Sequence, residues 1–118
     1  MDEFDIPIFK KSYDLYGEFY SCLKSFPKYE KYSLGQKCDL TLTEFVELLL
    51  LASELYKQEK VATLRRASVK LNLLRVFLRF CYELKILDKK KYLSLQIDID
   101  EIGRMLGGWL KSAKEKSS

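Results

Sequence analysis

Apolar residues recur at steps of three and four positions along almost the whole chain, which is the spacing of one face of an α-helix. The pattern predicts four helices, over residues 8–26, 29–57, 61–87 and 89–114. Pro27 is expected to end the first helix, because its ring excludes the helical conformation at the preceding residue. Asp88 is placed to cap the fourth helix. The first helix has an unusually aromatic face, with Phe9, Tyr13, Tyr16, Phe19, Tyr20 and Phe26.

The second segment allows two interpretations. Gly35 could kink it, and the stretch TLTE, from Thr41 to Glu44, resembles a capping box that would begin a new helix. The apolar stripe does not break at either place, which favours one long helix from residue 29 to residue 57. A short charged connection, KQEK, is then expected to lead into the third helix.

Four long helices joined by short turns predict a single all-α domain, an antiparallel up-down four-helix bundle. A chain of 118 residues with 47% hydrophobic content is large enough for one such core. The most apolar stretch, FVELLLLASEL, contains Glu47 and Glu54, so it does not resemble a membrane span. The N-terminus is acidic and lacks the layout of a signal peptide. We therefore expect a cytoplasmic protein that does not enter membranes.

The residue types offer little catalytic chemistry. The chain has no histidine, which removes the commonest general base and the commonest neutral metal ligand. Helical spacing separates Asp100 from Asp98 and Glu101, so the densest acidic group reads as a solvated face. We expect no catalytic residue, cofactor or metal. Three cysteines without a C-x-x-C pair are expected to be buried and reduced, at Cys22, Cys38 and Cys81.

The third predicted helix carries the charge of the protein. Residues 60–87 contain seven basic residues and one acid, a net of +6 in a chain whose total is +4. The same segment is apolar around most of its circumference and should therefore be buried on most sides. A narrow polar seam at steps of three and four runs along it, through Arg65, Ser68, Asn72, Arg75 and Arg79. Arg66 and Lys70 form a second small strip.

Two interpretations of the seam stay open. Its arginines can pair with acids of neighbouring helices, because the guanidinium fork meets a carboxylate with two hydrogen bonds. The candidate acidic partners in this interpretation are Glu44, Glu47, Glu54 and Asp98. Alternatively the seam faces a phosphate backbone or an acidic partner. The candidate binding residues are Arg65, Arg66, Lys70, Arg75 and Arg79.

A lone four-helix bundle cannot easily cover a helix that is apolar on so many sides, which favours oligomerisation. Gly103, Gly107 and Gly108 also favour a close contact with another helix. Each glycine in a helix costs roughly 0.5–1 kcal/mol relative to alanine, and packing gained at such a contact would offset that cost. Gly103 and Gly107 are four positions apart and share a face, where another backbone can approach. We predict a close helix crossing at these glycines, within one subunit or between two.

Two stretches carry a resemblance to a known family. The segment from TLRRASVK to GGWLKSAK resembles the second half of the accessory variability determinant (Avd) proteins of diversity-generating retroelements. FPKYEKYSLGQKC resembles the start of the second helix in that family and in the related four-helix bundle proteins encoded in ribosomal RNA intervening sequences. The resemblance spans about residues 8–114, and its most characteristic pieces are LRFCYELK and EIGRMLGGWL.

The resemblance implies a four-helix bundle assembled as a homopentamer. It also implies a non-catalytic accessory protein that binds a reverse transcriptase and nucleic acid, the template RNA or its cDNA, to support mutagenic reverse transcription. Five basic residues of the third helix lie in the segment that matches the basic helix of the family, so the resemblance implies partner or nucleic-acid binding at Arg65, Arg66, Lys70, Arg75 and Arg79. The alternative is a bundle protein of the intervening-sequence type, with a structural or interaction role and no reverse transcriptase partner.

Overall fold

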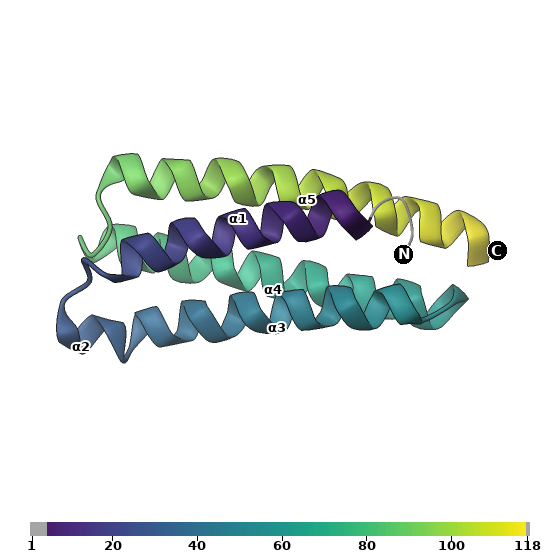
Figure 1. The fold of residues 1–118 in the computed structure, drawn as a ribbon, viewed down its shortest axis with the longest axis horizontal. Coiled ribbons are helices and arrows are strands. Elements are labelled where there is room, and N and C mark those ends of the chain that lie inside the picture. Colours follow the sequence, from purple (N-terminus) through teal and green to yellow (C-terminus); the bar gives the residue numbers. More distant parts are fainter. Residues whose placement is uncertain (1–4, 118) are drawn as a thin grey trace.

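Four long helices and one short helix make up the computed structural model, which describes residues 5–117. They are α1 (Asp5–Leu23), α2 (Lys28–Lys31), α3 (Leu34–Glu54), α4 (Lys57–Glu83) and α5 (Lys89–Ser117). The described residues contain no β-strand, which confirms the predicted all-α class. The four long helices run side by side and alternate in direction, as expected for an up-down bundle (Figure 1).

The order of the helices around the bundle is α1, α3, α4, α5. Helix α3 packs most extensively on α4, and α4 on α5, whereas α1 contacts α5 and α3 over a smaller area. The side formed by α1 and α3 therefore lies opposite the side formed by α4 and α5. This opposition matters below, because both sides carry exposed apolar residues.

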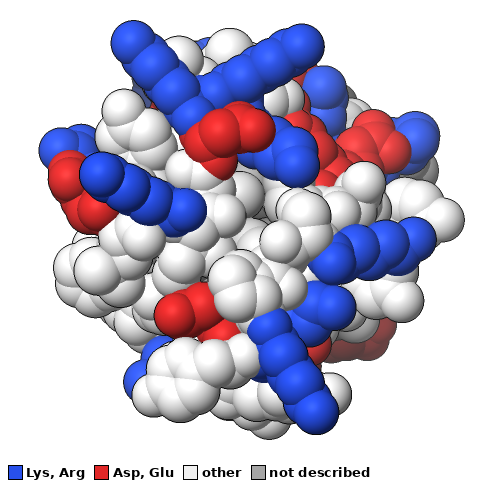
Figure 2. Space-filling view, turned by 90° about the vertical axis from the view of Figure 1, so that its left-hand side faces the viewer, with Lys and Arg blue, Asp and Glu red and all other residues white. Residues whose placement is uncertain are grey.

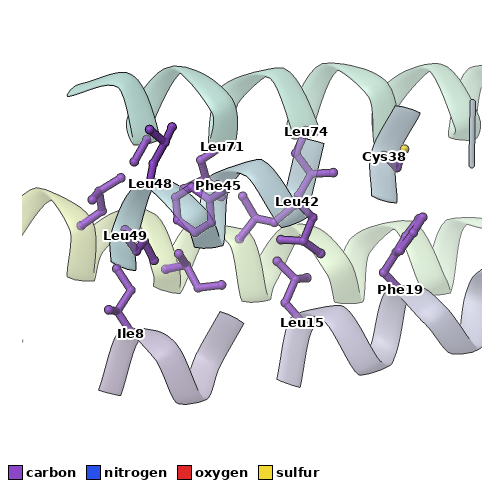
Figure 3. Packing of buried hydrophobic residues seen from close by; sticks show 14 of the residues in the cluster. Ile8, Leu15, Phe19, Cys38, Leu42, Phe45, Leu48, Leu49, Leu71 and Leu74 are labelled. Carbon is purple, nitrogen blue, oxygen red and sulfur yellow. The ribbon is translucent and has the colours of Figure 1, made fainter. Parts of the chain in front are cut away.

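The core runs along the whole bundle axis and is filled by residues from all four long helices. Leu15 and Phe19 of α1, Leu42 and Phe45 of α3 and Leu74 of α4 converge there (Figure 3). Removing one such side chain from water stabilises a fold by about 1.5–3 kcal/mol. The three cysteines are buried and free, as predicted. The thiol contact with Cys81 and burial both raise the pKa of Cys38.

The prediction of one continuous helix over residues 29–57 is wrong. Helix α2 ends at Lys31, and α3 starts at Leu34 after a break at Tyr32 and Ser33. The reason is tertiary packing around Gly35, which is buried where α3 begins. A Cβ at Gly35 would lie 2.5 Å from Cδ1 of Leu23 and 3.1 Å from the carbonyl oxygen of Glu30.

The two interpretations of this segment therefore both miss the position of the break. Thr41 and Glu44 lie well inside α3, and Thr41 is buried, so TLTE begins no helix. The KQEK stretch is the first turn of α4 rather than a connection. The chain instead reverses at Leu55 and Tyr56, which have extended backbones.

The turn between α4 and α5 follows standard capping chemistry at both ends. The backbone N–H of Lys91 donates to Oδ1 of Asp88 over 2.8 Å, which confirms Asp88 as the N-cap of α5. At the end of α4, the N–H of Ile86 donates to the carbonyl of Cys81 and that of Lys85 to the carbonyl of Tyr82. This pair of bonds is a Schellman motif, in which Lys85 occupies the left-handed position with φ 62°.

Replacing Lys85 by glycine should stabilise the protein. A side chain in the left-handed region costs about 1 kcal/mol that glycine does not, so the midpoint of thermal unfolding should rise by about 4 °C. Circular dichroism melts of the wild type and Lys85→Gly measure the difference. The matched control is Lys90→Gly inside α5, which should lower the midpoint. A Lys85→Gly variant that melts at or below the wild-type temperature would contradict the assignment of strain to this residue.

Candidate nucleic-acid and partner interface

Helix α4 positions the predicted binding residues between a buried and an exposed apolar side. Leu64, Leu71 and Leu78 point into the core and are almost completely buried. The opposite side is also apolar but open to solvent, at Val69 (66% exposed), Val76 (46%), Phe80 (48%) and Leu84 (64%). Neighbours within the chain therefore cover only one side of this helix. We call the four exposed residues the outer apolar face of α4.

Three of the five candidate basic residues have acidic partners. A guanidinium nitrogen of Arg75 donates to Oδ1 of Asp100 on α5. Nζ of Lys70 lies 3.3 Å from Oε1 of Glu44 on α3. Arg79 pairs within its own helix, where its Nε donates to Glu83 over 2.6 Å. The hydrogen bond with Glu83, followed by that with Tyr92, raises the pKa of Arg79.

Arg65 and Arg66 differ from the other three. Both side chains are exposed in the first half of α4. Among the described residues, no acidic side chain lies within ion-pair distance of either guanidinium group. The structure therefore divides the candidate set, with internal pairing at Lys70, Arg75 and Arg79 and uncompensated charge at Arg65 and Arg66. Of the four acids named from the sequence as partners, Glu44 alone pairs with a candidate residue.

Gly103 lies where α5 packs against α4. A Cβ at Gly103 would lie 3.1 Å from Nη2 of Arg75 and 3.8 Å from Cδ2 of Leu71. The missing side chain leaves room for Arg75 to reach across α5 to Asp100. A groove of about 420 Å³ runs between the two helices here and is lined by Ser68, Asn72, Arg75, Gly103, Arg104 and Gly107 among others.

The other two glycines, Gly107 and Gly108, are exposed. A Cβ at Gly107 would have no atom within 4 Å. A close approach at these two positions stays a prediction for contacts between subunits.

The aromatic face of α1 divides between the core and the surface. Phe19 and Phe26 are buried, whereas Tyr13 is 74% exposed and Tyr20 is 52% exposed. An apolar groove of about 290 Å³ runs between α1 and α3, lined by Phe9, Ser12, Tyr13, Tyr16, Thr43 and Val46. Periodicity did not reveal this surface, because helical spacing alone does not show how far around α1 its neighbours reach.

The acids of α5 contact its neighbouring helices while remaining partly exposed to solvent. Asp100 pairs with Arg75, and Glu101 lies 3.0 Å from Nζ of Lys11 on α1. Asp98 meets Glu18 of α1, and hydrogen bonding between the two carboxyl groups raises the pKa of Asp98 to about 6, with burial as the second cause. Among the described residues, no group of three or more cysteine or acidic side chains is arranged to hold a metal ion.

A second basic surface lies at one end of the bundle and was not predicted from the sequence. The connection from α1 to α3 and the turn from α4 to α5 meet at this end (Figure 1). We call it the lysine end and define it by Lys24, Lys28, Lys31, Lys85, Lys89, Lys90 and Lys91. The runs KYEK and DKKK were visible in the sequence, but nothing there showed that they adjoin.

Comparison with known protein families identifies the group to which the chain belongs. A family model described as bAvd-like matches residues 7–113, which is nearly the whole chain. The chain belongs to the bAvd-like family. This confirms the resemblance that the sequence analysis drew to Avd proteins. No curated protein matches the chain significantly. Within the described residues of this bAvd-like chain, none of the helices combines the length and apolar character that crossing a membrane requires.

The pair formed by Asp98 and Glu18 should make stability depend on pH. The fold raises the pKa of Asp98 from 3.8 to about 6, so the native state binds the proton more tightly than the unfolded state. Nearby Lys11 opposes this shift and Asp14 adds to it. The stabilisation from Asp98 is complete below about pH 4 and is lost as the pH rises to about 6.

An Asp98→Asn variant should remove this loss, since its amide can donate to Glu18 at any pH. We expect the variant to unfold at a higher temperature than the wild type at pH 8, with little difference at pH 4. Glu47→Gln, an exposed acid on α3, is the control. A difference in melting temperature between wild type and Asp98→Asn that stays constant from pH 4 to pH 8 would contradict the hydrogen bond between the Asp98 and Glu18 carboxyl groups.

Proposed function

We propose that this chain is a non-catalytic accessory subunit of a diversity-generating retroelement. It assembles with copies of itself and binds the reverse transcriptase and nucleic acid, template RNA or cDNA, in support of mutagenic reverse transcription. The observation that carries the proposal is the bAvd-like family match across residues 7–113. The exposed apolar and basic surfaces of the bundle support it, because they offer contacts of the two kinds that such a subunit needs.

Self-assembly is supported by two apolar surfaces on opposite sides of the bundle. The outer apolar face of α4 lies on one side, and the groove between α1 and α3 lies on the other. A contact between two different surfaces of identical subunits is heterologous, and it closes into a ring when the rotation permits. The homopentamer implied by the family resemblance is a ring of this kind. We propose that the two surfaces pack against each other between neighbouring subunits.

A charge placed in the outer apolar face should break this assembly. Light scattering of the wild type should give five times 13.9 kDa, or about 70 kDa. Phe80→Glu buries an unpaired carboxylate in the proposed interface and should reduce the mass toward that of one chain. Gln36→Glu, an exposed polar position on α3, is the control and should keep the wild-type mass. A wild-type mass of one chain would contradict the assembly.

Nucleic-acid binding should be electrostatic. If all five candidate residues of α4 contact phosphates, the logarithm of the binding constant should fall with the logarithm of salt with a slope of roughly −3.5 to −4.5. Arg65→Gln combined with Arg66→Gln should weaken binding more than Arg75→Gln combined with Arg79→Gln, because the latter pair already has acidic partners. Fluorescence anisotropy with labelled RNA between 50 and 300 mM salt, roughly the range where counterion release dominates, measures both effects. A flat salt response would rule out phosphate contacts.

The alternative, a bundle protein of the intervening-sequence type, shares this fold and predicts no reverse transcriptase partner. The family match favours the retroelement role. Co-purification with a reverse transcriptase of a diversity-generating retroelement separates the two functions directly, since only the accessory subunit should be retained.

A further inference from the structure

We propose that the lysine end is a binding surface for single-stranded nucleic acid, with its lysines on the phosphates and its exposed tyrosines stacked on bases. The inference rests on the proposed function for the class of partner. It goes further in naming a site that is separate from the arginines of α4 and in specifying the strandedness of the ligand.

The two connections at this end are strongly basic. The two connecting segments, residues 24–33 and 84–91, contain seven lysines and two acids, Glu30 and Asp88. Their net charge of +5 exceeds the +4 of the whole chain, so the remaining 100 residues carry 14 basic and 15 acidic residues. Figure 2 looks onto this end and shows basic side chains projecting around it, with acidic side chains beside several of them.

The charge of these lysines is not compensated within the bundle. None of the seven forms an ion pair with an acidic side chain of the described residues. Nζ of Lys91 lies 3.4 Å from Oγ of Ser25, and Nζ of Lys24 lies 5.3 Å from the ring centre of Tyr20. The carboxylate of Asp88 accepts the backbone N–H of Lys91 as the helix cap. A polyanion is the partner that so many uncompensated ammonium groups favour.

Aromatic side chains stand among these lysines. Tyr29 is 78% exposed and Tyr32 is 71% exposed, and they alternate with Lys28 and Lys31 along the chain. Beside the other connection, Tyr82 of α4 stacks on Tyr92 of α5 with ring centres 4.6 Å apart and ring planes 8° apart. A groove of about 580 Å³ is lined by Tyr82 and by Lys85, Lys89 and Lys91, together with the two acids Glu83 and Asp88.

Lysines interleaved with exposed tyrosines are the two parts of a single-strand site. In such a site, positively charged side chains follow the sugar-phosphate backbone of the strand, and its unstacked bases lie on aromatic rings. This stacking accepts any base, because every base has a π-face. A duplex cannot offer these contacts, since its base faces are already stacked. Helix α4 lacks this combination, because three of its five candidate residues are paired to acids.

The experiment compares charge-matched double variants at the two ends of the bundle. A labelled single-stranded RNA of mixed sequence, about 20 nucleotides long, spans one such site and is titrated by fluorescence anisotropy. Lys89→Gln with Lys90→Gln, and Lys28→Gln with Lys31→Gln, each remove two phosphate contacts. Each pair should reduce affinity about 25-fold in 0.1 M salt and lower the salt slope by about 1.4, at 0.7 per contact. Lys111→Gln with Lys114→Gln, near the opposite end, should bind like the wild type.

Two further variants test whether the lysine charges and the stacking of Tyr29 on bases, rather than a disturbance of the fold, account for RNA binding. Lys89→Arg with Lys90→Arg keeps the charges and should retain wild-type affinity, which a general disturbance of the fold would not. Tyr29→Leu should weaken single-strand binding at least about fivefold and leave binding of a duplex of equal length unchanged. Tyr56→Leu, equally exposed at the other end, should alter neither.

The outcomes distinguish this inference from the proposed function. Wild-type RNA affinity in both lysine variants, with a loss in Arg65→Gln combined with Arg66→Gln, would overturn the lysine-end site and leave the accessory role intact. Unchanged RNA affinity with lost retention of the reverse transcriptase would assign this end to the protein partner and also overturn the inference. A wild-type chain that binds no RNA at any salt concentration would overturn both.

Discussion

Helix α4 carries apolar side chains on two opposite sides, and a bundle of four helices covers only one of them. Leu71 and Leu78 are buried against α3 and α5, whereas Val76 and Phe80 remain about half exposed. A helix that is apolar on both sides is stable only where both sides leave water. The outer apolar face of α4 is the side that the bundle leaves in water. A second exposed apolar surface, the groove between α1 and α3, lies on the opposite side of the bundle. The chain therefore presents two different exposed apolar surfaces.

The ionic groups divide in a similar way between internal and external roles. The acids of α5 are engaged by its neighbours, with Asp100 on Arg75 of α4 and Glu101 on Lys11 of α1. These pairs are partly exposed, so each contributes modestly to stability while holding the helices in register. At the lysine end, by contrast, none of the seven lysines has an ion-pair partner among the described residues.

Local chemistry in the sequence predicted several features correctly. The steps of three and four positions identified the long helices, and Asp88 was recognisable as a cap because its role depends only on the next three residues. The break at Tyr32 and Ser33 was not predictable in this way. It depends on Gly35 lying against Leu23 and the carbonyl of Glu30, a contact between the end of one helix and the start of the next.

The sequence by itself determined the helical class, the burial of the cysteines and the family. These properties follow from periodicity and from short motifs that hold whatever the neighbouring helices do. Only the tertiary structure decided which cations are compensated, because Arg75 and Asp100 lie 25 residues apart and meet through the packing of α4 on α5. It likewise decided that the lysines of residues 24–33 and 84–91 share one end. An up-down topology places alternate connections at the same end of a bundle, and no local pattern contains that information.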